Sequence, residues 1–337
     1  MEKNMKKMTN ITRFIAFAMV LMMLVGVLSG CDFLPDNIKT CTVSFYVDGE
    51  LFTTKTVSIG STVSSPRAPE KENQVFVGWF AEGILTYEYD FSSKILVDTS
   101  LHAHYTLDAV SLTNKITTTT MRSVVVVKNK SYNTGLGGLV EIDFSNSQGS
   151  GVVLDISGGY CYVLTNYHVI EMDEGYARQT LTVEDPWGEQ YEAKVYRSSK
   201  TQKYAMDAKY DLALIYFPYT PTGDYQLLEI ETGVDPSPKS YVVSLGAPTG
   251  QKNSVTYGSV IEYRKLNYTE ENKNAEVEFD IIYHSAIIDY GSSGGPLLDS
   301  TGKLVGLNFA GYETTKHGCA IPISKITEFM NKYVYAK

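Results

Sequence analysis

Residues 289–298 read DYGSSGGPLL, a serine set among glycines and followed by a proline and two leucines. Glycine adopts positive φ angles at no steric cost, so the run predicts a tight turn between apolar segments. The Gly-x-Ser-Gly-Gly order puts Ser293, rather than Ser292, at the tip of this turn. The backbone N–H groups of Gly291 and Ser293 could then both face an oxygen that gains negative charge. The pattern is typical of a presented nucleophile.

Two motifs upstream supply the partners that such a serine needs. A serine hydroxyl is a weak nucleophile at neutral pH, so it requires a base within reach and an acid that fixes the tautomer of that base. His168 lies in TNYHV (165–169), at the end of a β-like run, and Asp211 lies in YDLALI (210–215), at the start of another. Asp207 is close by, but the apolar run after Asp211 favours Asp211 as the acid.

The chain from residue 121 onward is rich in short β-type runs. Such runs, separated by turns at short and even intervals, predict a barrel or a sandwich. Only the segment 324–333 has its apolar residues at helical spacing, and Ser324 would cap that helix. The predicted strands are 124–127, 151–154, 160–164, 193–196, 212–215, 241–245, 255–261, 277–283 and 304–309.

In this order the motifs resemble those of the trypsin-like serine proteases of chymotrypsin fold, in particular the bacterial HtrA-like branch. The matching pieces are GSGVVLD, YVLTNYHVI, YDLALIYF, HSAIIDYGSSGGPLLDSTGKLVGLNFAG and HGCAIPI. The resemblance implies a mainly β domain over residues 121–337, a double six-stranded β-barrel with a C-terminal helix. The chain is expected to depart from the HtrA pattern in one respect: it ends after that helix, with no room for a PDZ domain.

The same resemblance implies a role for each site residue. His168 would be the general base, Asp211 its orienting acid and Ser293 the nucleophile. The amides of Gly291 and Ser293 would form the oxyanion hole. No cofactor and no metal are implied.

The specificity pocket implied by the resemblance contains no carboxylate that could bind a lysine or arginine of a substrate. We therefore expect an apolar or small residue before the scissile bond of a protein or peptide substrate. His284 and His317 leave an acidic preference open. The pocket residues are Ile287, Ile288, Asn308, Phe309 and Ala310.

Residues 41–106 form a smaller β-rich unit that resembles the Listeria-Bacteroides (InlB B-type) repeat of bacterial surface proteins. The match rests on the VDGE hairpin, the FVGWF run and the closing LHAHY strand, and it implies a β-grasp-like module that could bind a surface ligand. Residues 107–120 show little apolar periodicity and are predicted to be a linker. The predicted strands of the module are 42–47, 52–57, 76–80, 89–92 and 101–105.

The N-terminus has the pattern of an export signal, with basic residues before an apolar stretch and small residues after it. Within it, Leu28-Ser29-Gly30-Cys31 resembles the bacterial lipobox, which implies cleavage after residue 30 and lipid attachment to Cys31. Residues 31–40 would be a tether, and the protein would lie outside the cytoplasm, anchored to the outer face of a bacterial cell membrane. An ordinary cleaved signal and an uncleaved anchor are the alternatives.

Composition excludes several classes of function. The formal charge is −9, and loss of the four basic residues and one acidic residue in the first 30 would bring it to −12, which argues against nucleic acid binding. Cys41, Cys161 and Cys319 are too far apart for a zinc site or a disulfide framework, although a Cys161–Cys319 bond is possible. His102 and His104 share a strand face but lack further ligands for a metal.

Two principal functions remain. The first is a membrane-anchored serine endopeptidase that acts through an acyl-enzyme, and the second is a surface binding protein or adhesin whose protease-like scaffold is catalytically silent. The intact set of His168, Asp211 and Ser293 favours the peptidase. An esterase with the same three residues is a weaker third, because the strand pattern is not the alternating strand and helix pattern of α/β-hydrolases.

Overall fold

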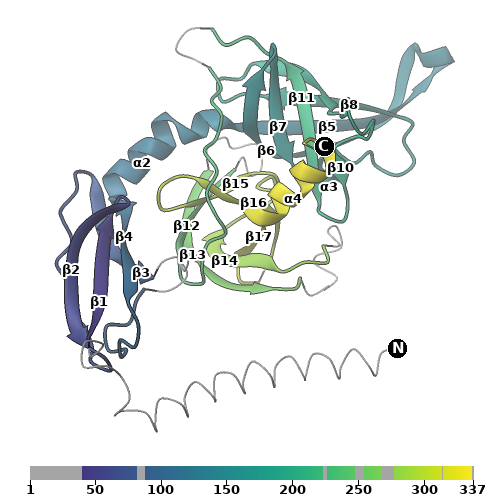
Figure 1. Cartoon of the computed structure of the whole chain (residues 1–337). Coiled ribbons are helices and arrows are strands. Elements are labelled where there is room, and N and C mark those ends of the chain that lie inside the picture. Colours follow the sequence, from purple (N-terminus) through teal and green to yellow (C-terminus); the bar gives the residue numbers. More distant parts are fainter. Residues whose placement is uncertain are drawn as a thin grey trace, which may run out of the picture. The chain divides into compact units, whose positions relative to one another are not determined.

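The computed structural model describes residues 40–81, 88–222, 226–246, 254–266, 277–312 and 314–335 (Figure 1). The predicted signal peptide (1–30), the lipidation site Cys31 and nearly all of the tether lie outside the described residues. The chain divides into two compact units, residues 1–69 with 77–104, and residues 70–76 with 105–337. Among the helices in the described ranges, none has the length and apolar character that spanning a membrane requires.

The N-terminal unit is built on a four-stranded sheet with the strand order β2-β1-β4-β3. The first two strands form the predicted hairpin, whose turn at Asp48 and Gly49 has positive φ angles of 53° and 84°. β1 also pairs in parallel with β4. Phe45 and Trp79 are fully buried and meet edge to face, 4.9 Å apart. The strands are β1 (Thr40–Val47), β2 (Glu50–Ser58), β3 (Gln74–Ala81) and β4 (Thr99–Leu107).

The strand predicted at 89–92 does not form. Asp90 accepts hydrogen bonds from the backbone N–H of Ser92 at 2.8 Å and from its hydroxyl at 2.6 Å, which closes a turn. Short polar side chains compete with sheet pairing in this way. The prediction was wrong because the alternating aromatic residues outweighed the turn-forming Asp90 and Ser92.

The predicted linker contains a helix, α2 (Ala109–Thr118). Asp108 caps it by accepting from the N–H groups of Val110 and Ser111 at 2.9 and 2.8 Å. Leu112 and Ile116, one helical turn apart, are buried in the core of the larger unit. This helix was not predicted because threonines, which lower helix propensity, surround its two buried residues.

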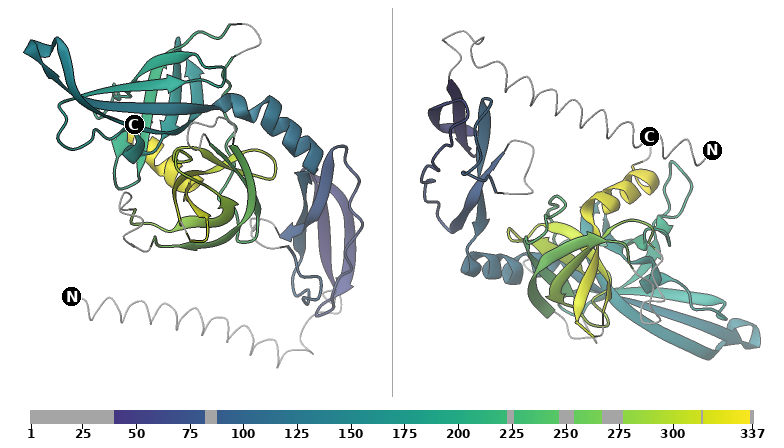
Figure 2. Two further views of the ribbon diagram at one scale, coloured as in Figure 1. Left: turned by 180° about the vertical axis from the view of Figure 1, so that it is seen from behind. Right: turned by 90° about the horizontal axis from the view of Figure 1, so that it is seen from below.

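The first barrel of the larger unit has six strands in the order β11-β7-β6-β5-β8-β9, closed by pairing of β9 with β11; β10 (Met206–Asp207) lies beside β11. β5 and β6 pair far past the rest of the barrel, as a ribbon that projects from it (Figure 2). The apolar interior of the first barrel includes Val127, Val163 and Ile215. The strands are β5 (Val124–Gly135), β6 (Val140–Ser157), β7 (Tyr160–Thr165), β8 (Arg178–Glu184), β9 (Gln190–Val195) and β11 (Leu212–Pro218).

The second barrel is closed in the order β12-β13-β14-β17-β16-β15. The two closed six-stranded barrels confirm the predicted double-barrel fold. The strand expected at 277–283 is present but begins later, at Ile281. The strands are β12 (Tyr241–Gly246), β13 (Ser254–Arg264), β14 (Ile281–Ile287), β15 (Pro296–Asp299), β16 (Leu304–Gly311) and β17 (His317–Pro322).

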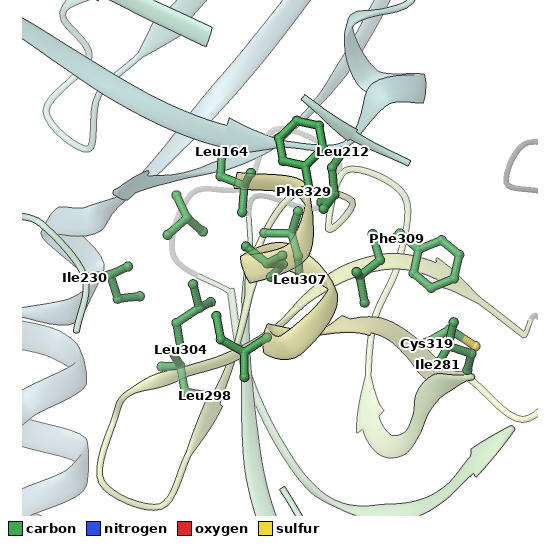
Figure 3. Close-up of a cluster of buried hydrophobic side chains, with 14 of the residues drawn as sticks. Leu164, Leu212, Ile230, Ile281, Leu298, Leu304, Leu307, Phe309, Cys319 and Phe329 are labelled. Carbon is green, nitrogen blue, oxygen red and sulfur yellow. The ribbon is translucent and has the colours of Figure 1, made fainter. Parts of the chain in front are cut away.

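The largest apolar cluster joins residues of both barrels and the C-terminal helix α4 (Ile323–Tyr333). Leu164 and Leu212 of the first barrel, Leu307 of the second and Phe329 of α4 all belong to it (Figure 3). The helix begins at Ile323, and its N-cap is Pro322, two residues before the predicted cap Ser324. Burial of this cluster fixes the barrels against each other, and the candidate site lies at their contact.

Candidate active site

His168 is presented by the short helix α3 (Tyr167–Ile170), which follows β7 directly. Its Nδ1 lies 2.8 Å from Oδ2 of Asp211, and its backbone N–H donates to Oδ1 of Asp211 at 3.0 Å. The carboxylate therefore contacts the histidine twice, which fixes both the ring and its tautomer. With the proton on Nδ1, Nε2 is left as a base.

Asp211 is held in place by the backbone around it. It is 1% exposed and adopts a positive φ of 50° in the tight turn before β11. Its carbonyl accepts from Nδ2 of Asn166 at 2.9 Å. Burial alone would lower the pKa of His168, but the charge and hydrogen bond of Asp211 raise that pKa above its ordinary value of 6.5.

Asp207, the alternative acid, has another role in the structure. Its Oδ2 accepts from Nζ of Lys332 at 3.0 Å and from the hydroxyl of Tyr333 at 2.7 Å, so it ties the C-terminal helix to β10. Although burial acts to raise the pKa of Asp207, these two hydrogen bonds hold it below the ordinary value of 3.8. The structure brings Asp211, and not Asp207, to His168.

Ser293 sits at the turn between β14 and β15. Its hydroxyl donates to the carbonyl of Phe309 at 3.3 Å. Its turn and α3 meet at Gly149, where an added Cβ would lie 2.6 Å from Cγ2 of Val169 and 2.8 Å from the carbonyl oxygen of Ser293. The residue after His168 and the residue at the turn thus border the same glycine, which places the two motifs together.

The backbone of the turn is fixed from the first barrel by Ser150 of β6. Its N–H donates to the carbonyl of Ser293, and its hydroxyl donates to the carbonyl of Gly291, both at 2.7 Å. Gly294 must be glycine, because its φ is +84° and a Cβ would lie 2.0 Å from the carbonyl oxygen of Ser150. Ser150 was not among the predicted site residues, although the GSGVVLD motif contains it.

The two amides expected to form the oxyanion hole have no competing acceptor. Within the described ranges the N–H groups of Gly291 and Ser293 donate to no protein atom, and Gly291 has a positive φ of 92°. Ser292, between them, is 5% exposed, and its hydroxyl accepts from the N–H of Asp289 at 3.2 Å. The turn is therefore tied down at Ser292 and open at the amides on either side.

The residues expected to line the specificity pocket differ in accessibility. Ile287 is 56% exposed and Ala310 is half-buried, whereas Ile288 and Phe309 are buried. The Asn308 side chain is fully buried and turned into the second barrel, where it bonds Ser244, Gly295 and Pro296. Its side chain therefore does not face a substrate.

The structure also bears on the cysteines and on metals. Cys161 and Cys319 are buried free thiols, one in each barrel, and burial raises the pKa of each to about 12. In the part of the chain that the structure covers, no three histidine, cysteine or acidic side chains come together as metal ligands. His102 instead stacks on Tyr46.

Comparisons with known proteins agree with this geometry. Residues 149–307 match the family model of the trypsin-like peptidase domain, and residues 42–104 match that of the Listeria-Bacteroides repeat domain. The human serine protease HTRA3 is 31% identical over 192 residues, which are 56% of this chain and 38% of the relative. The mouse serine protease HTRA4 is 31% identical over 195 residues, 58% of this chain and 36% of the relative.

The chain thus spans less than two fifths of the length of these relatives. Among solved structures, a serine endoprotease from Yersinia pestis aligns with a TM-score of 0.47 and 25% identity over 67% of each chain. The chain carries a trypsin-like peptidase domain of the HtrA type, preceded by a Listeria-Bacteroides repeat.

Proposed function

We propose that the protein is an extracytoplasmic serine endopeptidase that hydrolyses peptide bonds through an acyl-enzyme. The observation that carries this proposal is that His168 makes two hydrogen bonds to Asp211 next to the serine turn. In this turn the N–H groups of Gly291 and Ser293 donate to no atom of the described residues. A histidine held by a buried carboxylate is poised to accept a proton from a neighbouring hydroxyl. The similarity to HtrA serine proteases supports the same reaction.

The proposed reaction uses these groups in turn. Rotation of the Ser293 side chain away from the Phe309 carbonyl brings its hydroxyl to Nε2 of His168, which takes the proton as Oγ attacks the substrate carbonyl. The amides of Gly291 and Ser293 stabilise the resulting oxyanion. His168 then protonates the leaving amine, and a water activated by the same ring hydrolyses the acyl-enzyme.

The substrate preference we propose is a small or apolar residue before the scissile bond. The support is the apolar character of Ile287, Ile288 and Phe309, and the close packing of Ile288 on the backbone of Gly311, where an added Cβ would lie 3.1 Å from Cγ1 of Ile288. Recognition of an acidic residue has less support, because both candidate histidines are engaged. His317 contacts the hydroxyl of Tyr283 at 2.7 Å, and His284 is fully buried.

We further propose that a lipid on Cys31 anchors the protein to the outer face of a bacterial cell membrane, and that the 41–106 module binds a surface ligand. The support is the lipobox-like sequence and the similarity of the module to the Listeria-Bacteroides repeat. The wild type should begin at Cys31 and carry the mass of a diacylglyceryl group on that residue, and a Cys31→Ala variant should lack this mass. A wild-type chain without the lipid mass would contradict lipid anchoring.

A surface binding protein with a silent protease scaffold is the second candidate. It is favoured by one observation, the Ser293 hydroxyl bonded to the Phe309 carbonyl and not to His168. The two candidates make opposite predictions for covalent chemistry at Ser293.

A fluorophosphonate probe, applied to the full-length chain in detergent, separates the two candidates. For an endopeptidase we expect labelling of wild type and of Ser292→Ala, none of Ser293→Ala, and the same order in digestion of an unstructured protein. Ser292 is the matched control because it is the same residue type in the same turn, with its hydroxyl tied to Asp289. A folded wild type that neither labels nor digests would contradict the peptidase and favour the binding protein.

A further inference from the structure

A hydrogen-bonded chain of buried polar side chains lies inside the second barrel, next to the serine turn. It consists of Ser244 on β12, Asn308 on β16 and His284 on β14, which are 3%, 0% and 0% exposed. The reaction proposed above uses none of these side chains. Polar groups in an otherwise apolar barrel interior cost stability unless they are hydrogen-bonded, so their contacts indicate what they do.

Asn308 binds the segment that follows Ser293 with both its backbone and its side chain. Its carbonyl accepts from the N–H of Gly294 at 2.8 Å, and its own N–H donates to the carbonyl of Gly295 at 2.9 Å. Its Nδ2 lies 3.1 Å from the carbonyl oxygen of Gly295 and 3.2 Å from that of Pro296. These contacts hold the three residues directly after the nucleophile.

The Asn308 amide is held from both sides, by the turn and by His284. Nδ2 must face the turn, because the groups around it there are acceptors, and Oδ1 then faces Nε2 of His284 at 3.2 Å. A bond to this oxygen requires that Nε2 carry the proton. Burial lowers the pKa of His284 to about 4, against the opposing effect of its bond to Asn308, so the ring is neutral above about pH 5 and its single proton can lie on Nε2.

The position of His284 is itself tightly fixed. Gly318 on β17 lies flat against the ring, and a Cβ at Gly318 would come within 2.2 Å of Cε1. Any side chain at residue 318 would therefore push the ring away from Asn308. Glycine at residue 318 thus leaves the space that the imidazole of His284 occupies.

We infer that His284 is a positioning residue for the serine turn: through its bond to Oδ1 it fixes the Asn308 amide, which in turn holds the carbonyls of Gly295 and Pro296. This inference rests on the proposed function, since its consequence is the placement of the Ser293 hydroxyl and amide. Without the donor at residue 284, Oδ1 would be buried without a partner, and the amide would be held through Nδ2 alone. The carbonyls of Gly295 and Pro296 would then be held less firmly.

The test compares His284→Leu, which removes the donor, with His284→Gln, whose amide keeps one. A misplacement of a catalytic group can cost about 100-fold in rate, so we expect His284→Leu to lower kcat by about 10- to 100-fold with KM nearly unchanged. His284→Gln should recover most of that loss. In an Asn308→Ser background, where no amide remains to be oriented, His284→Leu should have little further effect.

Hydrogen exchange of the Gly294 amide gives a readout that needs no activity. We expect it to be protected in the wild type and His284→Gln and to exchange faster in His284→Leu, while amides of the first barrel stay protected. Equal kcat and equal Gly294 exchange in the wild type and His284→Leu would overturn the inference. A wild type that does not label at Ser293 overturns the proposed function instead, and the exchange comparison then still decides whether His284 holds the turn.

Discussion

Replacing Asp211 by asparagine tests the base and its acid without a change in size. The carboxylate accepts two bonds from His168, one from the backbone N–H and one involving Nδ1. An asparagine has a single oxygen. If that oxygen keeps the backbone bond, the NH₂ group faces Nδ1 and forces the proton onto Nε2, so the ring can no longer accept the proton of Ser293.

The expected loss is large. In the general Ser-His-Asp mechanism this exchange lowers kcat about 10⁴-fold, which is about 5.5 kcal/mol at 1.36 kcal/mol per tenfold. The pH profile should also move. Activity requires neutral His168, so it rises as the pH increases through the pKa that Asp211 holds above 6.5. In Asp211→Asn that supporting charge is gone, and the acid limb of the residual activity should shift to lower pH.

The assay is kcat/KM on a peptide with a small apolar residue before the scissile bond, from pH 4 to 9, with Asp207→Asn as the matched control. Asp207 lies four residues earlier and binds the C-terminal helix, so its amide variant should retain nearly wild-type kcat/KM. An Asp211→Asn variant within tenfold of wild type, or one whose acid limb does not move, would refute the assignment of Asp211 as the orienting acid.

Two further predictions concern stability. Gly294→Ala should abolish probe labelling and lower the free energy of unfolding in urea by about 2–4 kcal/mol, because the new Cβ meets the Ser150 carbonyl. The control is Gly158→Ala, which has a φ of +59° and no atom within 4 Å of the new Cβ, and which should cost only about 1 kcal/mol. Equal costs for the two variants would argue against the close approach of Gly294 to Ser150. Asp207→Asn should lower the free energy of unfolding by about 1 kcal/mol at pH 7. Since the pKa of Asp207 is depressed in the folded state, the wild type should lose this contribution as the pH falls through that pKa, below about pH 4. If the stability of the variant had the same pH dependence as that of the wild type, Asp207 would be excluded as the source.

The double-barrel fold and the candidate triad could be predicted from the sequence because each motif is local. The glycines around Ser293, the run before His168 and the run after Asp211 each define a strand end within a few residues. The roles of His168, Asp211 and Ser293 in catalysis, and of Gly291 in the oxyanion hole, stay predictions.

The supporting contacts could not be predicted, because they depend on which strands become neighbours. Ser150 lies 143 residues before Ser293, and Asn308 contacts His284 across two strands of a closed barrel. Strand order and register fix such pairs, and no local pattern encodes them. Asn308 was therefore expected at the pocket wall, although its side chain faces the barrel interior.

The turn that carries Ser293 belongs to the second barrel but is restrained by Ser150 of the first. The conformation of the turn that carries Ser293 therefore depends on the distance between the two barrels. Any event that parts the barrels, such as mild denaturant or a substitution in their shared apolar core, releases the Gly291 and Ser293 carbonyls before either barrel has to unfold. Loss of probe labelling at Ser293 would then indicate that the barrels have separated. Labelling at this residue would therefore measure the fraction of molecules in which the two barrels are correctly assembled.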